Sequence, residues 1–309
     1  MIKSFFIIVS LLIASNAFAG GTNLSELKKE SKIDDAGKLF LTELHDLNAP
    51  HAINPVSLSD KSIFGDKSFR FEVNHGECGQ AEGWSDCENE RERSELYFEW
   101  KDNQFGAARD EKWKREKWYR FYLFVPKGFN SVVPAKTSLI QWKRRRPSRV
   151  IIMFQYHKGG LLFNLNGDTF AKDQWYLMKK DKELRGQWTE ILFNTNWHPD
   201  ADKGYMKVWI DGEMKFDYKG KANDDVKGKE LNLRFGIYNS FLNKYRKVTG
   251  NTTYPQRVVY FDGVKGDTTC EKLLKDQTRC DALLAQTMSM PIDYHNFVYG
   301  KWSQKWSGG

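Results

Sequence analysis

The chain has 309 residues and a net charge of +8, from 48 lysines and arginines against 40 aspartates and glutamates. This length accommodates one large β domain or two modest domains. The basic balance favours an anionic partner, of which an acidic polysaccharide, a nucleic acid and an anionic membrane surface are the candidates. Beyond the N-terminal segment no stretch is long and apolar enough for a transmembrane helix, which excludes a helical membrane protein.

The N-terminal segment has the pattern of a secretory signal peptide. It opens with Met1-Ile2-Lys3, continues with an apolar run from Phe5 to Ala14, and ends in Ala17-Phe18-Ala19. Small residues two apart after a short apolar run are typical of a cleavage site, and the run is too short to span a bilayer. We therefore expect residues 1–19 to be removed and the protein to be exported, periplasmic or secreted, with no membrane attachment after cleavage.

The next segment, 20–60, carries weak helix and loop signals. Ser25 to Lys38 is polar with scattered leucines, a pattern that predicts a short helix. We expect this segment to be an N-terminal extension that packs on the core.

From residue 61 to 269 the sequence consists of short alternating apolar and polar runs, rich in Val, Ile, Tyr, Phe and Trp and bounded by turn residues, as is typical of β-strands. Asp211-Gly212 lies between two such runs and predicts a tight hairpin. Many short strands with few helices predict an all-β fold, a β-sandwich or jelly roll with short flanking helices. The expected strands are 69–73, 95–100, 118–125, 138–142, 150–156, 161–165, 188–193, 205–210, 214–216, 231–238 and 257–261.

The four cysteines form two close pairs in sequence, Cys78 with Cys87 and Cys270 with Cys280. An even number of cysteines in an exported chain indicates disulfides. Three connectivities exist, and proximity favours the two local pairs. Neither spacing suits a zinc site, so no metal is expected.

The last segment, 270–309, is predicted to begin with a helix from Cys270 to Thr287 and to end in an aromatic tail. We expect it to form a disulfide-linked strap on the sandwich and not a second domain.

Three of the expected strands carry polar, charge-capable side chains on one face and apolar side chains on the other, following the two-residue period of a strand. If these three strands lie side by side, their polar faces form one groove. Gly236 would leave an opening where a ligand could approach the backbone. The polar faces hold Arg91, Arg93 and Glu95 on the first strand, Gln141 and Lys143 on the second, and Arg234, Gly236 and Tyr238 on the third.

This set of side chains suits the cleavage of a uronic-acid polymer by β-elimination. The reaction requires that the C5 carboxylate is neutralised, the C5 proton removed and the departing glycosidic oxygen protonated. Arg, Gln and Lys donors neutralise the carboxylate and stabilise the charge that builds on it. A tyrosine beside Arg and Lys can transfer protons, because we expect its cationic neighbours to lower its pKa. No cofactor is required, and nothing in the sequence indicates a structural Ca²⁺ site.

The same three strands resemble a known family. Arg93-Ser94-Glu95-Leu96 resembles the R-[ST]-E-L strand of jelly-roll alginate lyases, Gln141-Trp142-Lys143 resembles their Q-[IVW]-H strand, and the segment 234–240 resembles their K-x-G-x-Y-N-Q strand, in the same order. Residues 84–96, 204–212 and 259–264 are similar to the heparin lyase I-like and glucuronan lyase-like group. The resemblance covers roughly residues 60–270. It implies a concanavalin-like β-jelly-roll sandwich and a polysaccharide lyase.

The resemblance also implies residue roles. Arg93 and Gln141 would contact and neutralise the substrate carboxylate, and Tyr238 would be the general acid. Arg234 stands where the family usually has Lys and would hold substrate. Lys143 stands where many relatives have the catalytic His, and it can neutralise a carboxylate but is a poor base unless its pKa is strongly lowered.

The identity of the base therefore stays open at the level of sequence. Tyr238 could perform both proton transfers, His157 or His75 could supply the base, or only binding could remain. The further expected substrate contacts are Arg91, Glu95, Arg144, Arg145 and Asn239.

The run from Lys143 to Arg149 is the densest positive patch, either a solvated loop or a cationic wall of the groove. Export and the absence of a nucleic-acid motif argue against nucleic acid, so we expect a monomer whose partner is an acidic polysaccharide. A non-catalytic polysaccharide-binding protein on the same fold is the second hypothesis. A jelly-roll glycoside hydrolase ranks last, because it needs two carboxylates flanking the bond and the sequence lacks an E-x-D-x-x-E strand.

Overall fold

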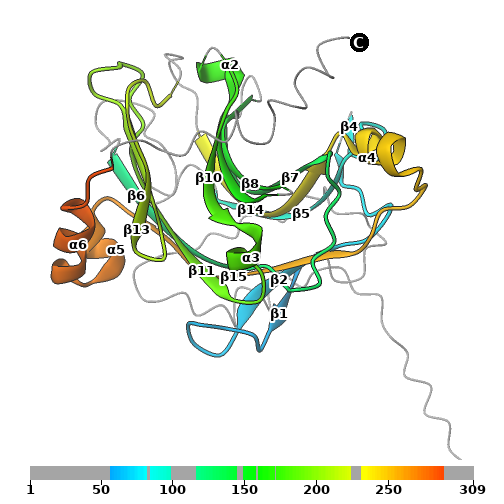
Figure 1. The fold of residues 1–309 in the computed structure, drawn as a ribbon, viewed down its shortest axis with the longest axis horizontal. Helices are drawn as coiled ribbons and strands as arrows, with labels where there is room; N and C mark the ends of the chain where they lie inside the picture. Colours follow the sequence, from blue (N-terminus) through cyan, green and yellow to red (C-terminus); the bar gives the residue numbers. More distant parts are fainter. Residues whose placement is uncertain are drawn as a thin grey trace, which may run out of the picture.

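The computed structural model describes residues 56–81, 84–98, 116–144, 149–157, 159–170, 172–223 and 231–288. These residues form two stacked antiparallel β-sheets with short helices at their margins (Figure 1). The seven-stranded sheet has the order β1 (Val56–Ser59), β2 (Ser68–Val73), β15 (Arg257–Asp267), β6 (Glu116–Phe124), β11 (Trp188–Asn196), β12 (Tyr205–Ile210) and β13 (Glu213–Lys219). The six-stranded sheet has the order β10 (Gln174–Lys180), β9 (Gly160–Leu165), β8 (Arg149–His157), β7 (Lys136–Arg144), β14 (Leu231–Ser240) and β5 (Glu92–Phe98).

The remaining elements are short. A two-stranded ribbon precedes β5, and the described residues include five helices, which lie at the margins of the sheets. No helix in the described ranges is long and apolar enough to cross a membrane. The ribbon is β3 (Gln80–Ala81) with β4 (Trp84–Ser85), and the helices are α2 (Gly167–Phe170), α3 (Asp181–Leu184), α4 (Leu242–Thr249), α5 (Cys270–Leu274) and α6 (Gln277–Leu284).

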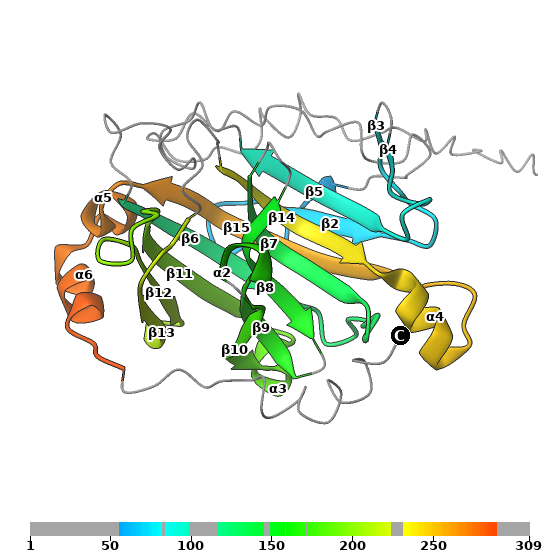
Figure 2. The same ribbon diagram turned by 90° about the horizontal axis from the view of Figure 1, so that it is seen from above.

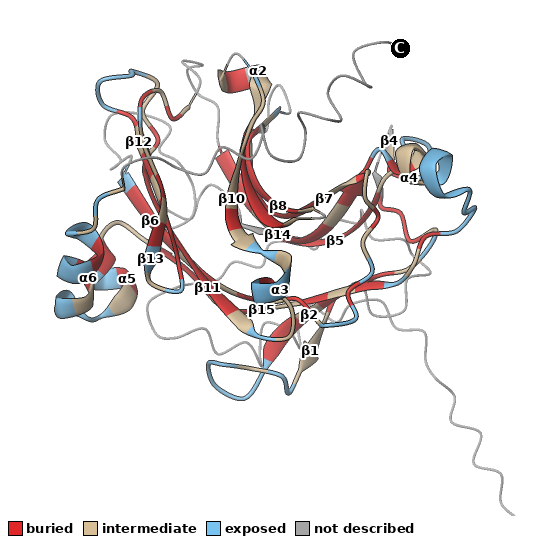
Figure 3. Cartoon of the chain, viewed as in Figure 1, coloured by how far each residue is buried: buried red, intermediate tan, exposed pale blue. Residues whose placement is uncertain are grey.

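The apolar faces of the two sheets meet in one core. Buried residues make up much of the strands of both sheets (Figure 3). Phe71 and Phe261 from the seven-stranded sheet both pack on Phe235 from the six-stranded sheet, with ring centroids 5.4 Å apart in each pair. Trp142 is fully buried against Tyr119. One face of each sheet thus lies in this core, and the predicted all-β jelly-roll sandwich is confirmed.

The predicted hairpin at Asp211-Gly212 is also confirmed. It joins β12 to β13, and both residues have positive φ, 51° and 83°, as a tight turn between twisted strands requires. Four strands of the described residues were not predicted, namely β1, β10 and the two short strands β3 and β4. β1 lies within the expected N-terminal extension and pairs with β2, and β10 forms an edge of the six-stranded sheet.

The two predicted disulfides, Cys78–Cys87 and Cys270–Cys280, are both present. The second disulfide links α5 to α6, which pack against the seven-stranded sheet around Trp209 and form a small cluster separate from the main core. The expected signal peptide, the helix over 25–38 and the aromatic tail lie outside the described residues.

The six-stranded sheet is curved, and its concave face is turned away from the other sheet (Figure 1). Seen from above in Figure 2, strands β5, β14, β7 and β8 run side by side across this face. Side chains that alternate with the core residues of these strands therefore project from the concave face.

Candidate active site

The three strands that carry the predicted site residues are neighbours in the six-stranded sheet, with β14 between β5 and β7. Tyr238 on β14 lies opposite Arg93 on β5, and Arg234 lies opposite Gln141 on β7. The expected adjacency of the three polar faces is therefore found in the structure.

Burial along β14 distinguishes the residues that face the core from those that face the concave side of the sheet. Leu233, Phe235 and Ile237 are fully buried in the core between the sheets. The alternate residues Arg234 and Tyr238 are half-buried on the opposite, concave face.

Arg93 is held by a carboxylate that the sequence analysis did not single out. Its guanidinium donates two hydrogen bonds to Asp86, Nε to Oδ2 at 2.5 Å and Nη2 to Oδ1 at 2.7 Å. Asp86 is fully buried, and Arg93 is 6% exposed. Burial alone lowers the pKa of Arg93, but the hydrogen bond that Arg93 donates to Asp86 and the charges of Glu95 and Asp86 outweigh it, and the net pKa is raised. Arg93 is thus a fixed cation.

Glu95 connects Arg93 to Gln141. Its Oε2 lies 3.3 Å from Arg93 Nη1, and its Oε1 accepts a hydrogen bond of 2.6 Å from Gln141 Nε2. All three side chains are less than 9% exposed. Glu95, expected as a substrate contact, therefore joins β5 to β7 beneath the exposed part of the site, where its hydrogen bonds fix the orientation of both neighbours.

Tyr238 lies against this network. The guanidinium carbon of Arg93 is 4.4 Å from the centroid of the Tyr238 ring, a cation–π contact. Burial raises the pKa of Tyr238, and the opposing effect of Arg93 and Arg91 does not cancel it. The cationic neighbours lower this pKa as expected, but the net pKa is raised, because desolvation of the phenolate exceeds their attraction. Tyr238 keeps its proton at neutral pH.

Lys143 shows the opposite behaviour. It is half-buried on β7, two residues beyond Gln141 and therefore on the same face of the strand. Burial, together with the positive charges of Arg234 and Arg93, lowers its pKa to about 8. A lysine in this state is partly neutral under mildly alkaline conditions and can accept a proton.

The two histidines considered as alternative bases come from elements other than β7 and β14. His157 is half-buried at the end of β8, where it pairs with Gly160. His75 lies in the loop after β2, with its Nδ1 3.7 Å from Glu92 and its ring against Tyr254. The contacts of His75 thus belong to a different cluster from that of Arg93.

The other expected substrate contacts differ in exposure. Arg91 is half-buried, and its charge lowers the pKa of both Lys143 and Tyr238. Arg144 is almost fully buried at the end of β7. Asn239 is fully buried and accepts a hydrogen bond from Thr137, so it holds β14 to β7. Arg145 lies outside the described residues.

Gly236 has a structural role that differs from the expected opening. Its φ is +135°, and a Cβ added there would lie 2.3 Å from the carbonyl oxygen of Ser94 and 2.7 Å from the ring of Phe71. The absent side chain thus makes room for strand β5 and for the core, not for a ligand.

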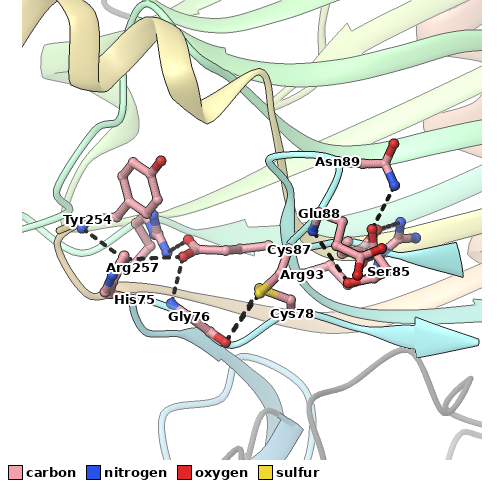
Figure 4. The surroundings of a disulfide bond; sticks show 12 residues. His75, Gly76, Cys78, Ser85, Cys87, Glu88, Asn89, Arg93, Tyr254 and Arg257 are labelled. Atoms are coloured by element: carbon pink, nitrogen blue, oxygen red, sulfur yellow. Dashed lines mark hydrogen bonds and ion pairs between the residues drawn. A yellow bond between two sulfur atoms is a disulfide. The ribbon is translucent and has the colours of Figure 1, made fainter. Parts of the chain in front are cut away.

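A disulfide-linked loop supplies Asp86. Cys87 follows Asp86 directly and is bonded to Cys78 (Figure 4). At the base of the same loop, the backbone N–H of Gly76 donates to Glu92, which forms a buried ion pair with Arg257. The disulfide and this ion pair together fix the loop that presents Asp86 to Arg93.

A polysaccharide lyase family model matches residues 40–265, and a search of curated proteins found no match. Solved structures similar to the chain include an endo-β-1,4-glucuronan lyase from the fungus Trichoderma reesei, at 17% identity and a TM-score of 0.49, covering 69% of this chain and 87% of that one. An alginate lyase from Klebsiella pneumoniae matches at 14% identity and a TM-score of 0.48, covering 70% and 85%. Because the family model spans most of the sequence, the chain belongs to the polysaccharide lyase family.

Proposed function

We propose that the protein cleaves a uronate-containing polysaccharide by β-elimination, with Lys143 as the base and Tyr238 as the acid. The observation that carries this proposal is that the two groups share one sheet face while their pKa values are shifted in opposite senses. A pair of titratable groups whose environments push their pKa values apart is suited to a base and an acid. Arg93 connects them, because its charge acts on Lys143 and its guanidinium lies on the Tyr238 ring.

The elimination follows from these assignments. Neutral Lys143 accepts the C5 proton, the electron pair forms the C4–C5 double bond, and the C4–O bond breaks. Tyr238 gives its proton to the departing glycosidic oxygen. The products are a new sugar end with a free hydroxyl and an unsaturated uronate.

The substrate carboxylate needs cationic or amide donors during this step. The guanidinium of Arg93 already serves Asp86, so we assign the carboxylate to Arg234 and Gln141, which face each other across β14 and β7. The Gln141 amide donates one N–H to Glu95 and has a second N–H for the substrate. Arg91 and Arg93 add positive charge around the enolate-like intermediate.

The test is an ultraviolet assay for the unsaturated product. The purified mature protein is incubated with glucuronan, alginate, heparin, heparan sulfate, hyaluronan and pectate. Absorbance should grow with at least one of these polyuronates or glycosaminoglycans. Tyr238→Phe should abolish the increase in absorbance, whereas Tyr260→Phe on the opposite sheet should not.

Two further variants separate the candidate bases. Lys143→Gln should remove turnover while His157→Gln retains it. The reverse result would assign the base to His157. If the protein binds a polymer of the panel but cleaves none of them, the proposed mechanism is wrong and the chain is a binding protein.

We also propose that the protein is exported. The signal-peptide pattern of residues 1–19 and the two disulfides support this proposal, because disulfides persist in oxidising compartments. Fractionation of the producing cell, followed by N-terminal sequencing, should find a mature chain that begins at Gly20 outside the cytoplasm. A cytoplasmic chain that retains Met1 would contradict it.

A further inference from the structure

Phe241 directly follows β14 and has an unusual backbone and exposure. Its φ and ψ are 61° and 42°, in the left-handed region that bulky side chains seldom adopt. Its neighbours Ser240 and Leu242 are buried at 7% and 1% exposure, whereas Phe241 itself is 43% exposed. The chain thus holds a large aromatic ring outward at a position where glycine or asparagine would fit with less strain.

The ammonium groups of two lysines lie over this ring. Lys136 Nζ lies 5.5 Å and Lys244 Nζ 4.9 Å from the ring centroid, one from β7 and the other from α4. Burial and the charge of Lys136 both lower the pKa of Lys244, so the two ammonium groups act on each other. An aromatic surface bordered by two cations suits a ring that has one apolar face and an anionic substituent.

The cluster lies on the same face of the sheet as the acid. Lys136 is paired with Ser240, and Ser138 is paired with Tyr238, so Lys136 and Ser138 share the concave face of β7. The hydroxyl of Ser138 is buried and makes no hydrogen bond within the part of the chain that the structure describes. A buried hydroxyl of this kind calls for a partner, and a sugar hydroxyl can supply one. In Figure 2, α4 continues from the end of β14, beyond the strands that carry the proposed active site.

We propose that Phe241, Lys136, Lys244 and Ser138 form a further uronate-binding subsite beside the proposed acid, which holds a neighbouring sugar of the same polymer chain. The inference rests on the proposed function for the class of ligand. The ring of Phe241 stacks on the apolar face of the sugar, the two ammonium groups bind its carboxylate, and Ser138 accepts or donates one hydrogen bond. The subsite increases affinity for long chains without taking part in the chemistry.

The test measures binding in the Tyr238→Phe background, so that it does not depend on turnover. Isothermal titration uses hexasaccharides prepared from glucuronan and from alginate. Phe241→Gly and the double variant Lys136→Gln/Lys244→Gln should each raise the Kd of the hexasaccharide that binds by about tenfold. Lys247→Gln and Val248→Ala, both exposed on α4, are the matched controls and should leave the Kd unchanged.

Thermal unfolding of the same variants distinguishes a ligand role from a structural one. Phe241→Gly should not lower Tm, because glycine relieves the left-handed backbone, whereas a ring needed for packing would lower Tm on removal. With Tyr238 restored, the KM for the polymer should rise and kcat should stay the same. A Kd within about twofold of the parent for both variants, or no binding of either hexasaccharide, overturns the subsite. The two proposals can fail separately. If Tyr238→Phe abolishes turnover but Phe241→Gly leaves the KM for the polymer unchanged, the subsite is wrong and the proposed function still holds.

Discussion

Asp86 and Arg93 form a buried, two-pronged ion pair, with the carboxylate accepting hydrogen bonds of 2.5 and 2.7 Å from the guanidinium. The same guanidinium lies on the ring of Tyr238. Asp86 therefore acts on the proposed acid through Arg93, as a positioning residue and not as a group that touches substrate.

Asp86→Asn tests this role. Replacing one partner of a buried ion pair leaves an uncompensated charge, so the free energy of unfolding should fall by about 3–5 kcal/mol. Misplacement of Arg93 should lower kcat by up to about 100-fold in the protein that remains folded. Because the charge of Asp86 raises the pKa of Tyr238, its loss should move the alkaline limb of the pH profile to lower pH. Asp200→Asn, in an exposed ion pair, is the control. An unchanged alkaline limb would assign Asp86 a role in stability only.

The pH profile should identify the base. Lys143 must be neutral to accept a proton, so kcat/KM should rise with pH and level off above about 8. Lys143→His should move this rising limb toward about 6.5, the ordinary pKa of histidine. Lys203→His, at an exposed lysine, should leave the profile in place. A rising limb that does not move in Lys143→His would exclude Lys143 as the base.

The charged form of Lys143 should also lower the free energy of unfolding. Its folded pKa of about 8 lies below the ordinary value of 10.5, so between these pH values the unfolded chain binds more protons. The free energy of unfolding therefore rises with pH across that window, as Lys143 loses its proton. Below about pH 8 Lys143 is charged in the folded and the unfolded protein, and it destabilises the fold by the full amount. Lys143→Met should raise the free energy of unfolding at pH 7 by about 1–2 kcal/mol, with a smaller gain near pH 10. Denaturant unfolding at the two pH values measures the difference, and an equal gain at both would refute the titration argument.

The two disulfides form a matched pair for the next prediction. They close loops of similar length, with sequence separations of 9 and 10. Replacing either pair with serines should lower the free energy of unfolding by about 2–3 kcal/mol. Only the Cys78→Ser/Cys87→Ser variant should lower kcat, because that loop carries Asp86. Equal kcat values for the two serine variants would show that the loop holds Asp86 without its covalent link.

Gly236 provides a test of the sheet itself. Gly236→Ala places a Cβ against the Ser94 carbonyl and the Phe71 ring, at 2.3 and 2.7 Å, and should destabilise the protein by about 2–4 kcal/mol. Gly212→Ala has a positive φ of 83° but open space around the new atom. It should therefore cost only about 1 kcal/mol. The difference in Tm between the two variants measures how much of the destabilisation comes from the contacts of the new Cβ. Similar Tm values would contradict the close approach of β5.

The fold was predictable because strand periodicity and turn residues are local signals. The alternation of Leu233, Phe235 and Ile237 with Arg234 and Tyr238 predicted the buried and open faces of β14. Asp211-Gly212 predicted the hairpin between β12 and β13. The strand β10 was missed because its Trp-Tyr-Leu-Met run has no polar alternation, and its lysines come only at its end.

The electrostatics of the site were less predictable. Asp86 lies in a loop, where no periodicity indicates a partner. The available signals were its place before Cys87 and the family resemblance of residues 84–96. The direction of the Tyr238 pKa depends on how far the strands on either side exclude water, which the sequence does not express. The same exclusion gives Lys143 its lowered pKa, so the residue that looked unsuited to act as a base became the proposed base.

The position of Asp86 next to Cys87 has a consequence for when the enzyme becomes active. In the reducing cytoplasm a newly made chain would lack the Cys78–Cys87 link. We expect such a precursor to hold Arg93 poorly, and therefore to be inert toward polyuronates inside the cell that makes it. If the chain is exported as proposed, maturation and activation would be a single oxidative event, completed only outside the cytoplasm.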